Sequence, residues 1–130
     1  MRRIAPVLSA ALIAALIAPG AAWAGYINNR AAWLALTPEA RVGYVQGLND
    51  SINYIFTDDS LPTALTKKGR LRCLVEQKTT SAILADRITM AYRDDRFAEA
   101  APTALYVFRM QDVCRAYINA ERANFGLPPA

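Results

Sequence analysis

The fold of this chain is clearest in residues 37–55, which read TPEARVGYVQGLNDSINYI. Thr37 has a hydroxyl suited to capping a helix, and Pro38 and Glu39 follow where proline and acidic residues favour a helix start. Apolar residues then recur at steps of three and four: Val42, Val45, Leu48, Ile52 and Ile55. This spacing places them on one side of an α-helix. The stretch predicts a long helix that begins after Thr37 and ends near residues 57–59.

Two glycines, Gly43 and Gly47, interrupt this helical pattern. Each costs about 1 kcal/mol relative to alanine in a helix interior. Because they lie four residues apart, they leave a flat patch on one side of the helix. We expect a second helix to approach closely there.

Three more helices are predicted from the same signals, a short one over residues 26–36 and two longer ones in the second half of the sequence. The first longer helix begins at Thr79 or Thr80 and closes at the charged run 93–96. Its expected buried face is Ile83, Leu84, Ile88, Ala91 and Tyr92. The second begins around Pro102. Its expected buried side is Leu105, Phe108, Cys114, Tyr117 and Ile118.

Residues 60–72 are predicted to be a polar connection, because they contain Leu61-Pro62 and a basic cluster around Gly69. The cluster consists of Lys67, Lys68, Arg70 and Arg72. A charge run of this kind is usually solvated. No segment alternates apolar and polar residues over a strand length. The predicted fold class is therefore all-α, a small bundle of three main helices plus a short N-terminal helix, closed by one disulfide.

Cys73 and Cys114 are the two cysteines of the sequence. In a small exported domain an even number of cysteines predicts a disulfide, here worth about 4 kcal/mol in the chain-entropy model. Two alternatives are a pair of free buried thiols and half of a metal site. A metal site would need further ligands, and the sequence has no histidine and no second cysteine pair.

The first 24 residues are predicted to be a cleaved signal peptide. Its parts are basic Arg2-Arg3, the uncharged run 4–18, the helix breaker Pro19-Gly20 and a small-x-small site at Ala22-Trp23-Ala24. The apolar run is shorter than the roughly 20 residues that a membrane-spanning helix needs. We expect cleavage between Ala24 and Gly25, with residues 25–130 forming one periplasmic domain. An uncleaved N-terminal anchor is the alternative.

Composition argues against several function classes. The sequence holds 15 Lys+Arg and 11 Asp+Glu, a net charge of +4, and loss of Arg2 and Arg3 leaves the mature part at +2. So small a charge gives no support for nucleic acid as a partner, nor for a membrane surface after cleavage. Without histidine the usual general base is missing. We therefore expect a protein that is not an enzyme and that holds no metal or other cofactor.

The order of landmarks along residues 38–120 resembles the Rap1a/Tai family of periplasmic immunity proteins. The matching landmarks are GYVQGLND at 43–50, Cys73-Leu74, Thr79-Thr80, Tyr92-Arg93-Asp94-Asp95, Ala101-Pro102-Thr103-Ala104-Leu105 and Cys114. The sequence departs from that family in two ways: Leu74-Val75-Glu76-Gln77 holds no proline after the first cysteine, and no extra cysteine lies before or within the first helix.

This resemblance implies a Rap1a-like domain that neutralises a peptidoglycan amidase, delivered by type VI secretion, by plugging its active site. Polar residues that a core does not need are the expected partner contacts: Lys67, Lys68, Arg70, Asp94 and Asp95. The alternatives are a small periplasmic chaperone or stress protein of the acid-tolerance type and a structural subunit of an envelope complex. The pattern leaves the oligomeric state open, a homodimer included.

Overall fold

Six α-helices and one short 3-10 helix make up residues 26–130, the part of the protein that the computed structural model describes. Their bounds are α1 Arg30–Leu34, α2 Pro38–Asn53, α3 Leu61–Glu76, α4 Ser81–Ala91, η1 Asp95–Phe97, α5 Pro102–Val113 and α6 Arg115–Ala123. No strand occurs in this range, and one disulfide joins two of the helical segments. The prediction of a small all-α fold with one disulfide is confirmed. The predicted signal peptide and its cleavage between Ala24 and Gly25 lie outside the described residues.

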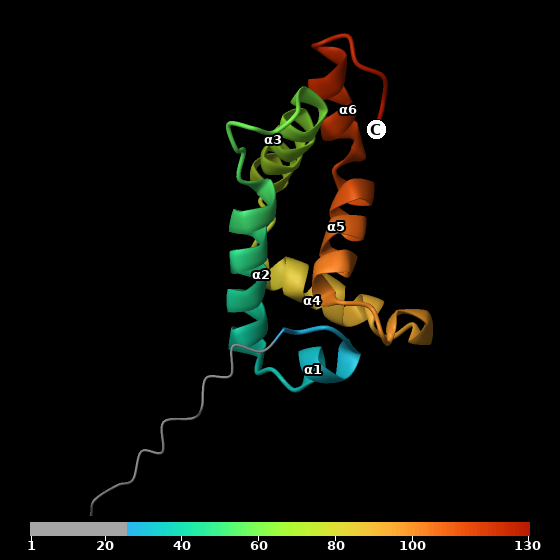
Figure 1. The fold of residues 1–130 in the computed structure, drawn as a ribbon. Helices are drawn as coiled ribbons and strands as arrows, with labels where there is room; N and C mark the ends of the chain where they lie inside the picture. Colours follow the sequence, from blue (N-terminus) through green and yellow to red (C-terminus); the bar gives the residue numbers. More distant parts are fainter. Residues whose placement is uncertain (1–25) are drawn as a thin grey trace, which may run out of the picture.

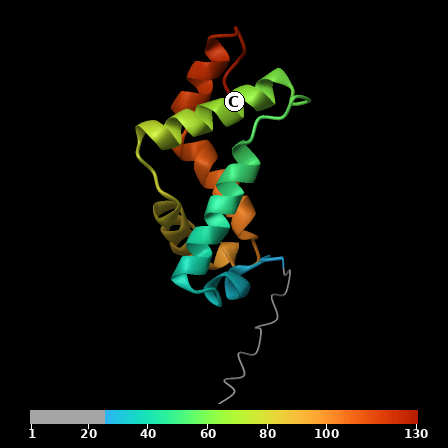
Figure 2. The same ribbon diagram turned by 90° about the vertical axis from the view of Figure 1, so that its left-hand side faces the viewer.

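The helices form an elongated bundle (Figure 1). Helices α2 and α5 stand upright at its two sides, and α1 and α4 lie at the lower end. Helices α3 and α6 lie at the upper end, where the C-terminus also lies, and Figure 2 shows α3 crossing in front of α6. The most extensive helix contacts join α3 to α6 and α2 to α4. The upper end of the bundle is thus a packed helix pair, and at the lower end α4 packs against α2.

Three predicted helix starts are confirmed, and one of them is the start of α5 at Pro102. Thr37 caps α2 by accepting a hydrogen bond from the backbone nitrogen of Ala40 at 3.2 Å, with Pro38 in the first turn. Thr80 caps α4 in the same way, accepting from the nitrogen of Ile83 at 3.3 Å. Helix α2 ends at Asn53, a turn earlier than predicted, because Tyr54 takes an extended backbone conformation.

The prediction that residues 60–72 form a polar connection is wrong, because α3 spans most of them. Ser60 caps α3 by accepting from the nitrogen of Thr63 at 3.4 Å, and Pro62 lies in its first turn. This is the same start signal as Thr37-Pro38. Lysine and arginine are good helix formers, and here their charges lie along a helix surface. The bundle therefore has four long helices before the short α6.

The predicted last helix is two helices that meet at Cys114. Helix α5 ends at Val113, and Cys114 has φ −100° and ψ 7°, outside the helical geometry that resumes at Arg115. The predicted buried faces also need correction at two positions, because the side chains of Ile83 and Phe108 are exposed.

The glycine that receives a neighbouring helix is Gly69 on α3. A Cβ atom placed there would lie 2.6 Å from the Cα of Ile118 on α6 and 2.8 Å from its backbone nitrogen. At Gly43 and Gly47 nothing lies within 4 Å of such an atom, so the predicted close approach at α2 is wrong. Those two glycines face outward on α2.

The disulfide joins Cys73 near the end of α3 to Cys114 between α5 and α6, with 5.6 Å between the two Cα atoms. Both side chains are fully buried in the main hydrophobic core. The other buried members of this core are Trp33, Val45, Leu74, Leu84, Ala85, Ile88, Ala91, Tyr92, Leu105, Tyr106, Met110 and Ile118. The cross-link therefore ties α3 to the α5–α6 junction from inside the core.

The close approach of α3 and α6 gives a first prediction. Replacing Gly69→Ala should lower the free energy of unfolding by about 1–2 kcal/mol, because overpacking against the backbone of Ile118 outweighs the gain of about 1 kcal/mol in helix propensity. Urea unfolding followed by circular dichroism measures the change.

The matched control is Gly47→Ala in the middle of α2, where a Cβ meets nothing within 4 Å. Alanine should raise the stability there by about 0.5–1 kcal/mol. If both variants shifted the unfolding midpoint in the same direction, the close packing of α3 on α6 at Gly69 would be wrong.

The buried cross-link gives a second prediction. The intact mass of the mature protein should rise by two hydrogens on reduction, and alkylation of the native, unreduced protein should add nothing. Replacing both cysteines with alanine should cost about 4 kcal/mol, since the bridge closes a loop with a sequence separation of 41. Two alkylated thiols in the native protein would contradict the pairing.

Candidate functional site

The five residues predicted to contact a partner fall into two groups. Lys67, Lys68 and Arg70 lie on α3, whereas Asp94 and Asp95 lie between α4 and α5. Figure 1 shows these segments at opposite ends of the bundle. The structure does not bring the two groups together into one surface.

Lys67 forms an ion pair within the protein. Its Nζ atom lies 2.7 Å and 2.9 Å from the carboxylate oxygens of Asp59, and both side chains are mostly buried. Asp59 also accepts a hydrogen bond from the backbone nitrogen of Phe56 at 2.9 Å. The hydrogen bond from Lys67 holds the pKa of Asp59 below its ordinary value. This pair fixes the α2–α3 connection onto α3.

Lys68 and Arg72 both bind Glu121 of α6. The Nζ of Lys68 lies 2.9 Å from one carboxylate oxygen of Glu121, and Nη1 of Arg72 lies 3.2 Å from the other. The Glu121 side chain is buried, and its pKa is lowered by hydrogen bonds, first from Lys68 and then from Arg72. These contacts hold α6 against α3 beside Gly69.

The two predicted acidic contacts, Asp94 and Asp95, are also engaged. Asp94 caps η1 by accepting from the backbone nitrogen of Arg96 at 3.0 Å, and hydrogen bonds from the Arg96 side chain lower the pKa of Asp94. Asp95 pairs with Nη1 of Arg30 at 2.7 Å, which joins this turn to α1. Both residues have roles within the fold.

Arg70 differs from the other cations of α3. It is only 8% exposed, and no acidic side chain pairs with it within the described residues. Its Nη2 atom donates a long hydrogen bond of 3.5 Å to Oε1 of Gln111, and its buried Nε–H has no hydrogen-bond partner among the described residues. Burial lowers the pKa of Arg70, although an arginine stays protonated at neutral pH. Arg70 is thus a buried cation without a counter-ion in residues 26–130.

A cavity of about 250 Å³ lies beside Arg70 at the N-terminal half of α3. Its lining is polar and basic, and consists of Pro62, Thr63, Thr66, Lys67, Arg70 and Arg122. In contrast, an apolar groove of about 680 Å³ follows the outer side of α5. This α5 groove is lined by Tyr26, Ala101, Thr103, Ala104, Val107, Phe108 and Gln111. Gln111 joins the two, because it lines the groove and accepts the bond from Arg70.

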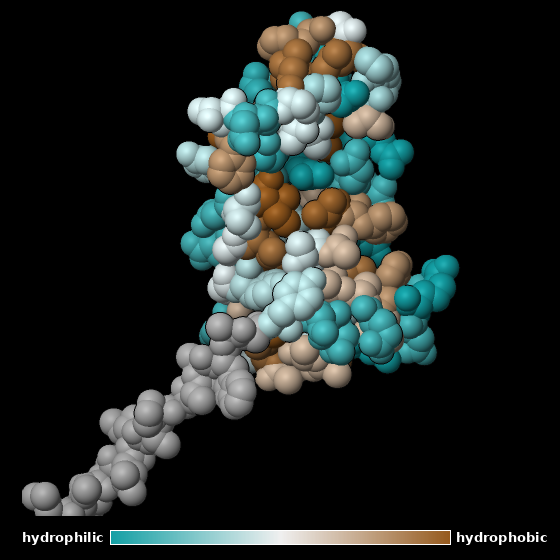
Figure 3. Space-filling model, in the orientation of Figure 1, coloured by the Kyte–Doolittle hydropathy of each residue, from teal (hydrophilic) through white to brown (hydrophobic). Residues whose placement is uncertain are grey.

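Solvent-exposed aromatic side chains border the α5 groove. Phe108 is 52% exposed and Tyr26 is 74% exposed. Figure 3 shows hydrophobic side chains gathered in the middle of one face of the molecule, with hydrophilic ones around them. A surface with this composition is typical of protein–protein contact.

One feature of the sequence, the length of an apolar run in α5, indicates this groove, although the helical spacing does not. Residues 104–108 are five consecutive apolar residues, and one helix face cannot bury them all. Leu105 and Tyr106 are buried in the core and Val107 is half-buried against it, so Ala104 and Phe108 are left exposed on the outer side. Spacing alone places Phe108 on the core side, whereas the length of the apolar run shows that some of its members must lie outside.

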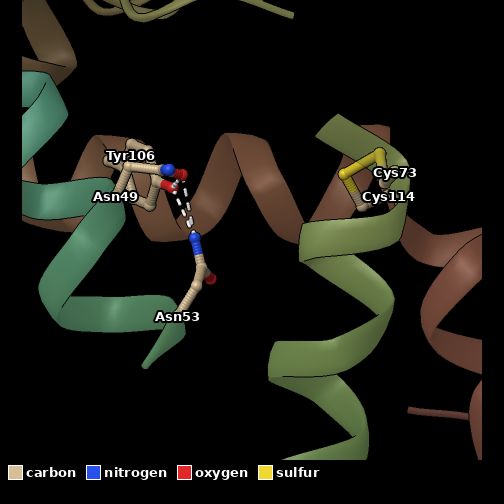
Figure 4. Close-up of a disulfide and its surroundings, with 5 residues drawn as sticks. All are labelled: Asn49, Asn53, Cys73, Tyr106 and Cys114. Atoms are coloured by element: carbon tan, nitrogen blue, oxygen red, sulfur yellow. Dashed lines mark hydrogen bonds between the residues drawn. A yellow bond between two sulfur atoms is a disulfide. The ribbon is translucent and has the colours of Figure 1, made fainter. Parts of the chain in front are cut away.

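A buried polar network joins α2 to α5 (Figure 4). The Tyr106 hydroxyl donates to Oδ1 of Asn49 at 2.7 Å, and Nδ2 of Asn53 donates to Asn49 and to the Tyr106 oxygen at 2.9 Å and 3.0 Å. Burial raises the pKa of Tyr106. The Asn53 Oδ1 atom points away from the other two residues, and no group in the described part of the chain bonds to it. The network has no nucleophile or base, so we assign it to the positioning of α5.

Residues 26–130 contain no group of three or more His, Cys, Asp or Glu side chains arranged to hold a metal ion. None of the helices in this range combines the length and apolarity that a membrane crossing requires. No protein-family model, no curated protein and no solved structure matches the sequence. The resemblance to the Rap1a/Tai family stays a prediction from the sequence.

The charges on Glu121 give a prediction for low pH. Because its pKa in the folded state lies below the ordinary value of 4.5, the stabilisation from Lys68 and Arg72 is complete above pH 4.5 and is lost as the pH falls through the lowered pKa. The thermal midpoint should therefore fall steeply below pH 4.5. Glu121→Gln should lower the midpoint at pH 7 and flatten this decline.

The control is Glu99→Gln, which changes an exposed glutamate in the turn before α5. This variant should follow the wild-type profile from pH 7 to pH 2. A Glu121→Gln profile as steep as that of the wild type would show that Glu121 does not carry the acid sensitivity.

Proposed function

We propose that this protein is an exported periplasmic binding protein that holds a partner protein on the α5 groove, in the manner of immunity proteins that block a peptidoglycan amidase. The observation that supports the proposal most strongly is the groove itself, an exposed apolar surface on a helix whose other side is already buried in the core. The partner is expected to present apolar side chains next to an acidic one, because Gln111 of the groove lining accepts a hydrogen bond from Arg70.

The residues of the groove suit protein recognition. Exposed aromatic side chains such as Phe108 and Tyr26 are the type that dominate binding energy at interfaces. The fold does not need Phe108 in the open, since the core side of α5 is filled by Leu105, Tyr106 and Met110. An exposed Phe108 lowers the solubility of the protein and does not stabilise the fold, which favours a role in binding.

The immunity class is supported by three properties of the molecule. The order of its sequence landmarks resembles that family, its disulfide is compatible with an oxidising compartment, and a cross-linked bundle supplies the rigidity that blocking an active site requires. A rigid partner loses less conformational entropy on binding. Neutralisation by occlusion needs no chemistry from the protein itself.

The acid-tolerance chaperone is the second candidate. It is favoured by the carboxylates of Asp59 and Glu121, whose lowered pKa values make the attachments of α3 sensitive to acid. Protonation of both would loosen α3 and expose apolar surface. Fluorescence of a dye that binds hydrophobic surface, followed from pH 7 to pH 2, tests this function. A flat signal excludes it.

The binding proposal is tested with the mature protein as bait for periplasmic extract, followed by mass spectrometry and by calorimetry with the purified partner. Phe108→Asp should weaken binding at least tenfold, because it places a charge in the centre of the groove. Val75→Asp is the matched control, since Val75 is also apolar and exposed but lies on α3 outside the groove. It should bind as the wild type does.

If the retained partner is a peptidoglycan amidase, the wild type and Val75→Asp should inhibit it, and Phe108→Asp should not. Equal affinity of the partner for Phe108→Asp and wild type would exclude the α5 groove as the contact. A partner without amidase activity would leave a binding protein but remove the immunity class.

A further inference from the structure

Within residues 26–130, the cation of Arg70 is buried without an acidic partner, and the other cations that line its cavity are already engaged. Lys67 pairs with Asp59, and Nε of Arg122 donates to the carbonyl oxygen of Pro128 at 2.6 Å. Of the Arg70 guanidinium, Nη2 makes only the 3.5 Å bond to Gln111, and the buried Nε–H makes none. The guanidinium therefore has donors left for a ligand.

Burying a charge without a counter-ion is unfavourable, and the cost falls when an opposite charge is supplied. The contrast with Glu121 is informative, because that buried carboxylate receives two cations from α3 itself. Arg70 lies one turn away from Lys67 on the same helix, yet no carboxylate of residues 26–130 pairs with it. An anion from outside would complete this site.

The cavity beside Arg70 has a basic lining that suits such an anion. It measures about 250 Å³, and its lining includes Lys67 and Arg122. The hydroxyls of Thr63 and Thr66, which also line it, already bond to the Ser60 hydroxyl and to the carbonyl oxygen of Pro62. The cavity lies along residues 62–70 of the 16-residue α3. The planar guanidinium matches the geometry of a carboxylate, which it can bind through two parallel hydrogen bonds.

We propose that the cavity beside Arg70 is a carboxylate-binding subsite that receives one acidic group of the docked partner. This proposal rests on the proposed binding function and names the chemistry that the partner must present. Gln111 connects the subsite to the α5 groove, so the acidic group should be flanked by apolar residues in the partner. The carboxylate comes from an aspartate or glutamate residue or from the C-terminus of the partner.

The test observes Arg70 directly in the mature, disulfide-bonded protein without any partner. In a ¹⁵N–¹H correlation spectrum, the buried Nε–H of Arg70 should give a separate resonance, which Arg70→Lys identifies by its loss. Titration with sodium acetate should shift this resonance along a single-site saturation curve. Sodium chloride at the same ionic strength should not shift this resonance. Acetate should not shift the resonances of the exposed arginines.

Two short peptides then distinguish the sources of the carboxylate. One is acetyl-Leu-Glu-Leu-amide, in which only the glutamate carries a carboxylate, and the other is acetyl-Leu-Leu with a free C-terminus. The peptide that matches the partner should shift the Arg70 resonance at lower concentration than acetate does. Arg70→Gln should abolish the peptide's effect on the thermal midpoint, whereas Arg93→Gln, at an exposed arginine after α4, should keep it.

An Arg70 resonance that stays fixed in acetate and in both peptides would overturn the subsite. So would an equal response to chloride, or a response to inorganic phosphate and not to acetate. Because the experiment uses the protein alone, these outcomes are independent of Phe108→Asp and of partner capture. The α5 groove could bind a partner without the subsite, and each proposal can therefore fail separately.

Discussion

The architecture depends on the contact between the backbones of α3 and α6 at Gly69 and Ile118. A helix can approach another this closely only where a side chain is absent, and Gly69 supplies that gap. One turn later the disulfide from Cys73 to Cys114 fixes the same crossing. With the crossing set, the rotation of α3 about its own axis is set too. Arg70, the residue after Gly69, is thereby directed into the interior.

That rotation separates four cations that look alike in the sequence. Lys68 and Arg72 meet Glu121 on α6, and Lys67 meets Asp59 on the connection that precedes α3. Arg70 meets only the amide of Gln111. A solvated basic run would contribute little to the fold or to recognition. On this helix, three of the charges stabilise packing, and the fourth is the one that we propose binds a carboxylate.

The landmarks that suggested a family have structural roles in this protein. The hydroxyl of Tyr44 lies 3.2 Å from that of Thr103, Asn49 accepts from Tyr106, and the Tyr92 hydroxyl donates to the carbonyl of Ala100 at 2.6 Å. Burial raises the pKa of Tyr92 to about 12. Residues that position helices carry information about the fold, whereas the proposed contact with a partner depends on surface residues such as Phe108.

The sequence by itself determined the all-α class, the starts of α2 and α4 and the pairing of its two cysteines, because each of these depends on a few neighbouring residues or on a count. It also held a local start signal for α3 at Ser60 and Pro62, and a sign of exposed residues in the apolar run 104–108, but helical spacing alone showed neither. The break at Cys114 and the burial of Arg70 go with contacts between residues some 40 to 50 positions apart, such as the Cys73–Cys114 disulfide and Arg72 with Glu121. The spacing of apolar residues predicts that a segment is helical. Which side of the helix is buried depends on the other helices that pack against it.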